Sequence, residues 1–175
     1  VDTYFYRGPQ AASEPETRAM VELARKHHPA AVFSYHSNGT ALLVPYTIDG
    51  ATHPEPSVAW QVAQGIHARL ETTIRGRHYK LIRKIYSVDG TDQDWYYYEF
   101  GSLAYIIEAP RRHPLPKELT QEIIDSRAIW QYPLERWMSG PSLSLQLIDG
   151  KGQPMAARVH FTEIALKAGE PWRSN

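Results

Sequence analysis

A short apolar run that ends in a carboxylate limits what this chain can fold into more than any other feature. The run is Leu103–Ile107, and Glu108 follows it directly. Because the run is continuous rather than alternating, it predicts a strand that is buried on both faces, and helices cover both faces of the sheets that contain such strands. The sequence therefore predicts an α/β fold with Glu108 at the end of a central strand.

Two more short runs enclose a histidine. Ala31–Tyr35 predicts another buried strand, and His36 follows it. Ser37–Gly39 has the residue types of a turn, and Ala41–Val44 predicts a third strand, which Pro45 ends. Open α/β sheets bind their ligands at the carboxyl ends of strands. His36 is therefore a second candidate for a functional site.

Three helices are predicted around these strands. Ser13–Glu16 fits a capping box with proline in the first turn, and the helix that it opens should end before Pro29. Apolar residues at helical spacing predict a second helix over Val58–Arg75 and a long closing helix over Leu119–Met138. We expect Pro133 to interrupt the closing helix, because proline lacks the N–H that a helix interior needs.

A change of hydrophobic period near Gly140 predicts a domain boundary. Beyond it the apolar residues alternate over Leu143–Ile148, Asp149–Gly152 has turn chemistry, and Ala156–Phe161 should pair back as a hairpin. We therefore expect one domain over residues 1–139 and the start of an all-β sandwich over residues 140–175. The second part is too short to be a complete sandwich.

The composition excludes several classes of function and leaves the compartment open. Among 175 residues, 19 basic side chains balance 19 acidic ones, so the charge favours neither nucleic acid nor an anionic membrane as partner. There is no cysteine, so a metal site must use histidine and carboxylate ligands. No stretch predicts a membrane span, and no signal peptide is expected at Val1. A periplasmic or secreted location stays compatible with these observations.

The residue pattern alone leaves the roles of the candidate side chains open. His36 could bind a metal or merely cap its strand end. Glu108 could act as a general base or form an ion pair with Arg111 or Arg112. Tyr86 stands beside the turn-like segment Asp89–Asp94, where it could donate to a substrate or simply be half-buried.

The HxxE sequence at His160–Glu163 is not a metal site by this reasoning. Residues three apart in a strand of period two point to opposite faces, so the pair cannot hold one metal together. About half an occurrence of such a motif is also expected by chance in a chain of this composition.

Several segments, in order, resemble the zinc metallocarboxypeptidases, also called funnelins, over most of Gly8 to Gly140. The sequence from Ser13 to Ala19 is similar to the family's SEPET segment, and the HS turn with its following strand matches. The spacing from the tyrosine to the catalytic glutamate matches as well. The matching residues are Ser34–Ser37, Leu42–Tyr46, Tyr86, Gly90, Gln93–Trp95 and Glu108.

The resemblance implies a role for each matched residue. His36 would be the third ligand of a Zn²⁺ that polarises the scissile carbonyl and activates a water, in a site of two histidines and one glutamate like that of carboxypeptidase A. Glu108 would be the general base, and Tyr86 would close over the terminal residue of a peptide. Thr47 and Gln93 match positions that line the pocket for the substrate's terminal side chain.

Asn38 stands where the digestive enzymes have tyrosine, so the resemblance does not extend to that subsite. Two other features, Gln93 and the segment that begins at Gly140, point to the regulatory branch of the family rather than to the digestive one. The segment Gly140–Phe161 resembles the start of the transthyretin-like sandwich that follows the catalytic domain in regulatory carboxypeptidases, and bacterial relatives share this layout.

The resemblance also implies that this chain holds only part of a catalytic site. In the family, the HxxE that supplies two zinc ligands and the arginines that hold the substrate carboxylate precede the position of Val1. We therefore expect the C-terminal part of a mixed-sheet α/β/α carboxypeptidase domain, with the N-terminal half of that domain and the C-termini of peptides or proteins as partners. Alone, the chain should bind zinc weakly at best and hydrolyse nothing.

Two other functions remain as alternatives. One is a zinc amidohydrolase of the aspartoacylase type, which Tyr86 and the Asp94–Trp95 pair fit less well. The other is an inactive binding module of the same fold, which substitution of the upstream ligands would favour.

Overall fold

The computed structural model describes residues 6, 8–51, 57–70, 78–110, 115–140 and 145–157. The chain divides into two compact units, Val1–Ala30 and Ala31–Asn175. The first unit holds helix α1 (Pro15–His27), and the second holds all the other helices and strands of the described residues. Each unit is considered by itself.

Helix α1 begins and ends close to its predicted limits, but its predicted capping box is absent. Glu14 is the N-cap residue and accepts no side-chain capping bond, because the Ser13 hydroxyl donates to the Glu14 carboxylate instead. Pro15 supplies a φ that suits the first helical position. At the other end His28 adopts a left-handed conformation and its N–H bonds to Ala24 O, which ends the helix before Pro29.

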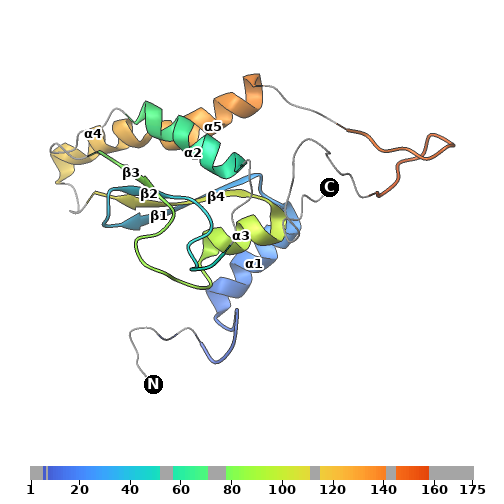
Figure 1. The fold of residues 1–175 in the computed structure, drawn as a ribbon, viewed down its shortest axis with the longest axis horizontal. Coiled ribbons are helices and arrows are strands. Elements are labelled where there is room, and N and C mark those ends of the chain that lie inside the picture. The colour runs from blue at the N-terminus through green and yellow to red at the C-terminus, as the bar shows by residue number, and fades with distance from the viewer. Residues whose placement is uncertain are drawn as a thin grey trace. The chain divides into compact units, whose positions relative to one another are not determined.

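The second unit is built on a four-stranded mixed sheet with the order β1-β4-β2-β3 (Figure 1). The strands are β1 (Ala31–Ser37), β2 (Ala41–Leu43), β3 (Lys80–Ile82) and β4 (Leu103–Ala109). β1 and β4 are parallel, β2 and β3 are parallel, and β2 runs antiparallel to β4. The predicted α/β class with a mixed sheet is therefore confirmed.

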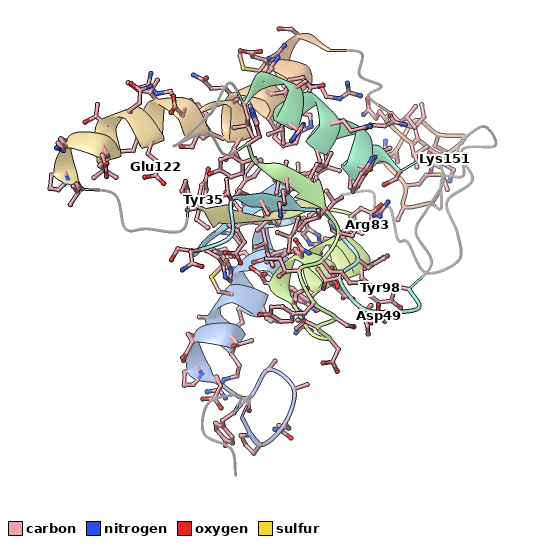
Figure 2. The ribbon with its side chains drawn as sticks, turned by 60° about the vertical axis from the view of Figure 1, so that its left-hand side comes forward. Tyr35, Asp49, Arg83, Tyr98, Glu122 and Lys151 are labelled. Carbon is pink, nitrogen blue, oxygen red and sulfur yellow. The ribbon has the colours of Figure 1, made fainter. Side chains whose placement is uncertain are left out.

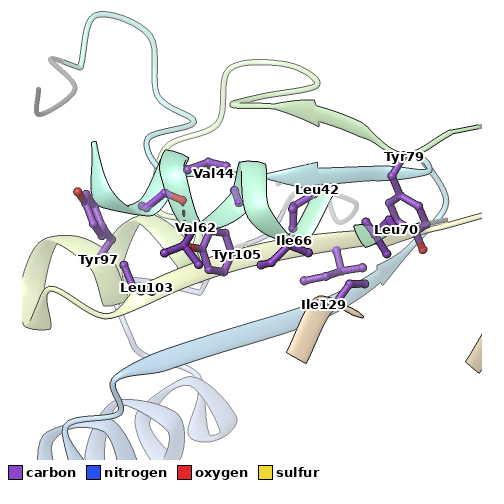
Figure 3. Close-up of a cluster of buried hydrophobic side chains, with 13 residues drawn as sticks. Leu42, Val44, Val62, Ile66, Leu70, Tyr79, Tyr97, Leu103, Tyr105 and Ile129 are labelled. Atoms are coloured by element: carbon purple, nitrogen blue, oxygen red, sulfur yellow. Dashed lines mark hydrogen bonds between the residues drawn. The ribbon is translucent and has the colours of Figure 1, made fainter. Parts of the chain in front are cut away.

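Strand β4 is the central strand that its apolar run predicts. Leu103, Tyr105 and Ile107 point to the face that α2 (Val58–Arg69) and α5 (Ala128–Ser139) cover (Figures 1 and 3). The Tyr105 hydroxyl donates to Ala59 O on α2 at 3.0 Å, which satisfies the one polar group of this buried side chain. Burial also raises the pKa of Tyr105.

The two helices on this face approach each other closely at a glycine. A Cβ at Gly65 of α2 would lie 2.1 Å from the Tyr132 ring of α5, so no larger residue fits there. The Arg69 guanidinium lies 4.6 Å from the centroid of the same ring. The glycine inside the predicted helix is thus explained by packing.

The opposite face of the sheet is the one that carries Glu108. Its apolar side chains are Ala41, Leu43 and Ile106, which form a small cluster of their own. Helix α3 (Asp92–Phe100) contacts β4 on this side of the sheet (Figure 1). Its Thr91 N-cap side chain accepts from Asp94 N, so the helix begins inside the segment that turn chemistry predicted over residues 89–94.

Three predicted elements differ from the observed ones. β1 is half-buried rather than buried, because it lies at the edge of the described sheet. α2 ends at Arg69, because the backbone leaves the helix at Leu70 while the Leu70 side chain stays in the core. The remainder of the predicted helix, residues 71–75, lies outside the described residues.

The closing helix is the third difference. It is divided at Arg127 rather than at Pro133, into α4 (Pro116–Ser126) and α5. Arg127 N donates to Ile124 O, three residues earlier, and this 3₁₀-type hydrogen bond marks the division. Pro133 lies buried inside α5, and no break occurs there.

Residues 145–157 contain a single antiparallel bridge, Ile148 to Pro154. The predicted turn lies between them, and the Asp149 carboxylate accepts from Lys151 N and Gln153 N. The outer arms of the predicted hairpin, together with the HxxE at residues 160–163, lie outside the described residues. The division into domains near Gly140 stays a prediction. In the described part of the chain, no helix is long and apolar enough to cross a membrane.

Candidate active site

His36 and Glu108 are neighbours on adjacent parallel strands. The register of β1 and β4 pairs the Cα atoms of His36 and Glu108, so both side chains leave the same end of the sheet on the same face. β1 and β4 are next to each other in the sheet although about seventy residues of sequence separate them. The two candidates that the strand pattern identified separately therefore belong to one site.

The imidazole of His36 has one partner on its own strand. Ser34 Oγ lies 3.1 Å from His36 Nε2, and the two side chains share a face because they are two residues apart. If Nε2 donates to Ser34, the lone pair of the neutral ring is on Nδ1. The arrangement therefore leaves one ring nitrogen able to bind a cation.

The turn that follows His36 is tied to the strand end that follows Glu108. Gly39 N and Thr40 N both donate to Ala109 O, at 3.0 and 3.2 Å. These bonds connect the end of β1 to the end of β4 independently of the sheet ladder. They fix the backbone on both sides of the His36 and Glu108 side chains.

The buried carboxylate of Asp94 holds the loop after β2 in place through hydrogen bonds to Thr47. Asp94 accepts from Thr47 N through both oxygens, at 2.9 and 3.1 Å, and from Thr47 Oγ1 at 2.7 Å. Thr47 Oγ1 also lies 3.2 Å from Val88 O and 3.3 Å from Thr91 Oγ1. The Thr47 hydroxyl is therefore engaged within the protein, and its role in substrate binding stays a prediction.

We expect Asp94→Ala to destabilise the folded domain by about 2–4 kcal/mol, because it leaves the buried N–H and hydroxyl of Thr47 without their charged acceptor. Urea unfolding of the complete catalytic domain measures the change. Asp92→Ala is the matched control, since Asp92 is exposed at the start of the same helix. Equal losses for the two variants would contradict the role of Asp94 as the buried anchor.

Gln93 of α3 is a buried residue that contacts β4. Its side chain is 1% exposed, and Gln93 Oε1 accepts from Ile106 N of β4 at 2.9 Å. Gln93 Nε2 has no hydrogen-bond partner among the described residues. The bond to Ile106 N holds Gln93 against β4, the strand that carries Glu108.

Tyr86 lies on the segment between β3 and α3, with its side chain 70% exposed. The backbone around it is anchored on both sides. Lys84 forms an ion pair with Asp49, and Ser87 Oγ accepts from Asp49 N at 3.1 Å. Tyr86 therefore projects from an anchored segment, and its side chain has room to move.

Comparison with known proteins identifies the family and the fold. The family model for zinc carboxypeptidase matches residues 2–128. The chain belongs to the zinc carboxypeptidase family. Carboxypeptidase A6 of Mus musculus is 34% identical over 96 residues, which cover 53% of this chain and 22% of that protein. Mast cell carboxypeptidase A of Mus musculus is 31% identical over 96 residues, again 53% of this chain and 23% of that protein.

Several solved structures share the fold of this chain. Carboxypeptidase A from Helicoverpa armigera superposes with a TM-score of 0.59 at 19% identity, over 74% of this chain and 36% of its own. Bovine thrombin-activatable fibrinolysis inhibitor, in complex with tick carboxypeptidase inhibitor, gives 0.58 at 22% identity, over 70% and 46%. The carboxypeptidase chain described here thus spans less than half the length of these proteins. The matches favour a carboxypeptidase over the aspartoacylase-type alternative.

The described part of this carboxypeptidase chain does not form a metal site by itself. It contains no group of three histidine, cysteine, aspartate or glutamate side chains that could hold an ion. His36, with one ring nitrogen available, fits as a single ligand of a zinc ion that other residues also bind. A zinc site in this family member therefore needs ligands from beyond the described residues.

Two residues that contact the candidate side chains have no role assigned from the sequence. Ser34 lies in the matched segment Ser34–Ser37, but only the strand places its hydroxyl beside His36. Gly39 has the pattern of a turn residue, whereas the structure places it against Glu108. The period of two in β1 could have found Ser34, but no local pattern could have found the contact of Gly39.

Proposed function

We propose that this chain supplies one zinc ligand, His36, and the general base, Glu108, of a metallocarboxypeptidase that removes C-terminal residues from peptides. The observation that carries the proposal is the register of β1 and β4, which pairs His36 with Glu108 at one end of the sheet. A base beside a metal ligand is the arrangement that water-dependent peptide hydrolysis requires.

In this proposal, the residues of the chain and the zinc ion that they would help to bind have different roles in the hydrolysis. Zinc, when bound, supplies Lewis acidity toward the scissile carbonyl. Glu108 takes a proton from the attacking water and passes it to the amine nitrogen as the C–N bond breaks. Tyr86, exposed on its anchored segment, closes over the terminal residue of the peptide.

Ser34 orients the zinc ligand in this proposal. Its hydroxyl holds His36 Nε2 and leaves Nδ1 for the metal. We expect Ser34→Ala to weaken zinc binding by the complete domain about tenfold. A chelator competition measures the affinity, and Ser37→Ala is the control because Ser37 lies on the opposite face of β1. Unchanged affinity in Ser34→Ala would remove Ser34 from the site.

The exposure of the edge strand β1 supports the proposal that a second segment covers this strand and completes the domain. β1 is parallel to β4, yet its side chains are half-buried to exposed, and Tyr35 is 55% exposed (Figure 2). Parallel strands are normally covered on both faces and paired on both edges. The proposed partner is the N-terminal half of the catalytic domain, which would carry the HxxE ligands and the arginines for the substrate carboxylate.

Thr47 and Gln93 line the pocket for the terminal side chain in this proposal. Both are buried: Thr47 is bonded to Asp94 of α3, and Gln93 of α3 is bonded to Ile106 N of β4. The support for Gln93 is an amide nitrogen without a partner among the described residues, which is a donor for a polar side chain. The neutral amide fixes no preference for one residue type.

The segment after α5 is proposed to begin a transthyretin-like sandwich. The bridge between Ile148 and Pro154 and the Asp149 turn support a hairpin at this point. The bacterial origin that this layout suggests, and a periplasmic or secreted location, stay predictions.

Incubation of the complete, zinc-loaded domain with a peptide tests the proposal. Mass spectrometry should show loss of single residues from the C-terminus, and a peptide with an amidated C-terminus should resist cleavage. Cleavage of internal bonds, or of acylated amino acids alone, would contradict a carboxypeptidase.

A further inference from the structure

The turn between His36 and β2 packs against the side chain of Glu108 through a glycine. A Cβ at Gly39 would lie 2.8 Å from Glu108 Cβ and 3.1 Å from Glu108 Cγ. It would also touch Ile85 Cδ1 at 3.4 Å, the residue directly before Tyr86. No side chain fits at this position unless one of its neighbours moves.

The requirement for glycine here is one of space and not of backbone conformation. Gly39 is not among the glycines with a positive φ, so an alanine could adopt its backbone conformation. The obstacle is the stem of the Glu108 side chain, that is, its Cβ and Cγ atoms. The atom nearest to Gly39 is Cβ, which moves only when the backbone of β4 moves. β4 pairs with β1 on one side and with β2 on the other, so this backbone is held firmly.

We propose that Gly39 is a positioning residue for Glu108. By resting directly on the Cβ–Cγ stem, the bare backbone of the turn sets the direction in which the Glu108 carboxylate leaves the sheet. The bonds from Gly39 N and Thr40 N to Ala109 O hold the turn in this place. The same turn begins at His36, so the turn fixes the base relative to the zinc ligand.

The inference rests on the proposed role of Glu108 as general base. A methyl group at Gly39 must displace either the turn or the stem by several tenths of an ångström, because contacts below 3.0 Å are not tolerated. Proton transfer depends on the placement of the base, and a misplacement of about 1 Å costs on the order of a hundredfold in rate.

The test is Gly39→Ala in the complete, zinc-loaded domain. We expect kcat to fall about tenfold or more, KM to change less than twofold, and the bound zinc to stay at one per chain. A loss of kcat without a matching change in KM or in zinc content is a result that a purely structural role would not produce. Gly150→Ala is the matched control, because a Cβ there meets nothing within 4 Å.

A second variant relieves the contact. Ile85→Val removes the Cδ1 that the new methyl would touch, and the Ile85 side chain is exposed enough for the loss to cost little stability. In the double variant with Gly39→Ala the turn can move away from Glu108, so part of the lost kcat should return.

Three results would overturn the inference: a kcat for Gly39→Ala within twofold of Gly150→Ala, a parallel loss of zinc and kcat, or failure of both Gly39 variants to fold. The last two would show that Gly39 serves the fold alone. A wild-type domain without peptidase activity would instead overturn the proposed function, so the two failures are distinguishable.

Discussion

Glu108→Gln in the complete catalytic domain is expected to lower kcat for a C-terminal peptide bond by about a thousandfold, within the range that general-base catalysis contributes. Glutamine keeps the size of the side chain but cannot accept the proton of the attacking water. Because Glu108 is not a ligand in this account, one zinc per chain should remain bound. Steady-state kinetics and metal analysis of the same preparation measure both quantities.

The matched control for this prediction is Glu22→Gln, the same substitution at an exposed position of α1. It should leave kcat, KM and zinc content unchanged. Appreciable residual activity in Glu108→Gln would show that another group is the base. Loss of zinc from Glu108→Gln would instead place Glu108 among the ligands.

The isolated 175-residue chain is expected to bind zinc at least about a thousandfold more weakly than the complete domain. Of the proposed zinc ligands this chain contains only His36, and the described residues form no group of three potential ligands. Zinc affinity comes from several protein ligands held in place together. Calorimetric titration of both proteins measures the difference. Far-ultraviolet circular dichroism of the isolated chain shows whether it is folded during the titration.

The complete domain provides the complementary variant for this prediction. His36→Ala should release zinc, whereas His78→Ala, at an exposed position before β3, should retain it. Tight one-to-one binding of zinc by the isolated chain would contradict the account, because it would require ligands that the described residues do not assemble.

The fold was predictable where one pattern dominates the local sequence. The continuous run before Glu108 predicted a buried central strand, and β4 has that position. Where two tendencies compete, prediction was wrong. The helix at residues 92–100 is rich in aromatic residues without a clear helical stripe, and its N-cap, Thr91, gave a stronger turn signal than helix signal. Proline at position 133 suggested a break, but packing against the core keeps α5 intact.

The candidate residues could be selected from the sequence, but their arrangement in space could not. The order and spacing of the motifs identified His36 and Glu108, yet only the parallel register of β1 and β4 shows that the two are paired. The contacts of Ser34 and Gly39 depend on side-chain direction and on the approach of distant segments. The period of two in β1 indicates the direction of the Ser34 side chain, but no local pattern contains information about the contact of Gly39 with Glu108.

The central claim is that His36 binds zinc while Glu108 stands beside it as a base. A crystal structure of the complete, zinc-loaded domain tests this most directly. The account predicts a zinc–nitrogen distance of about 2.1 Å to His36, two further ligands from the preceding part of the domain, and Glu108 outside the set of ligands. Zinc bound without His36, or bound directly by Glu108, would contradict it.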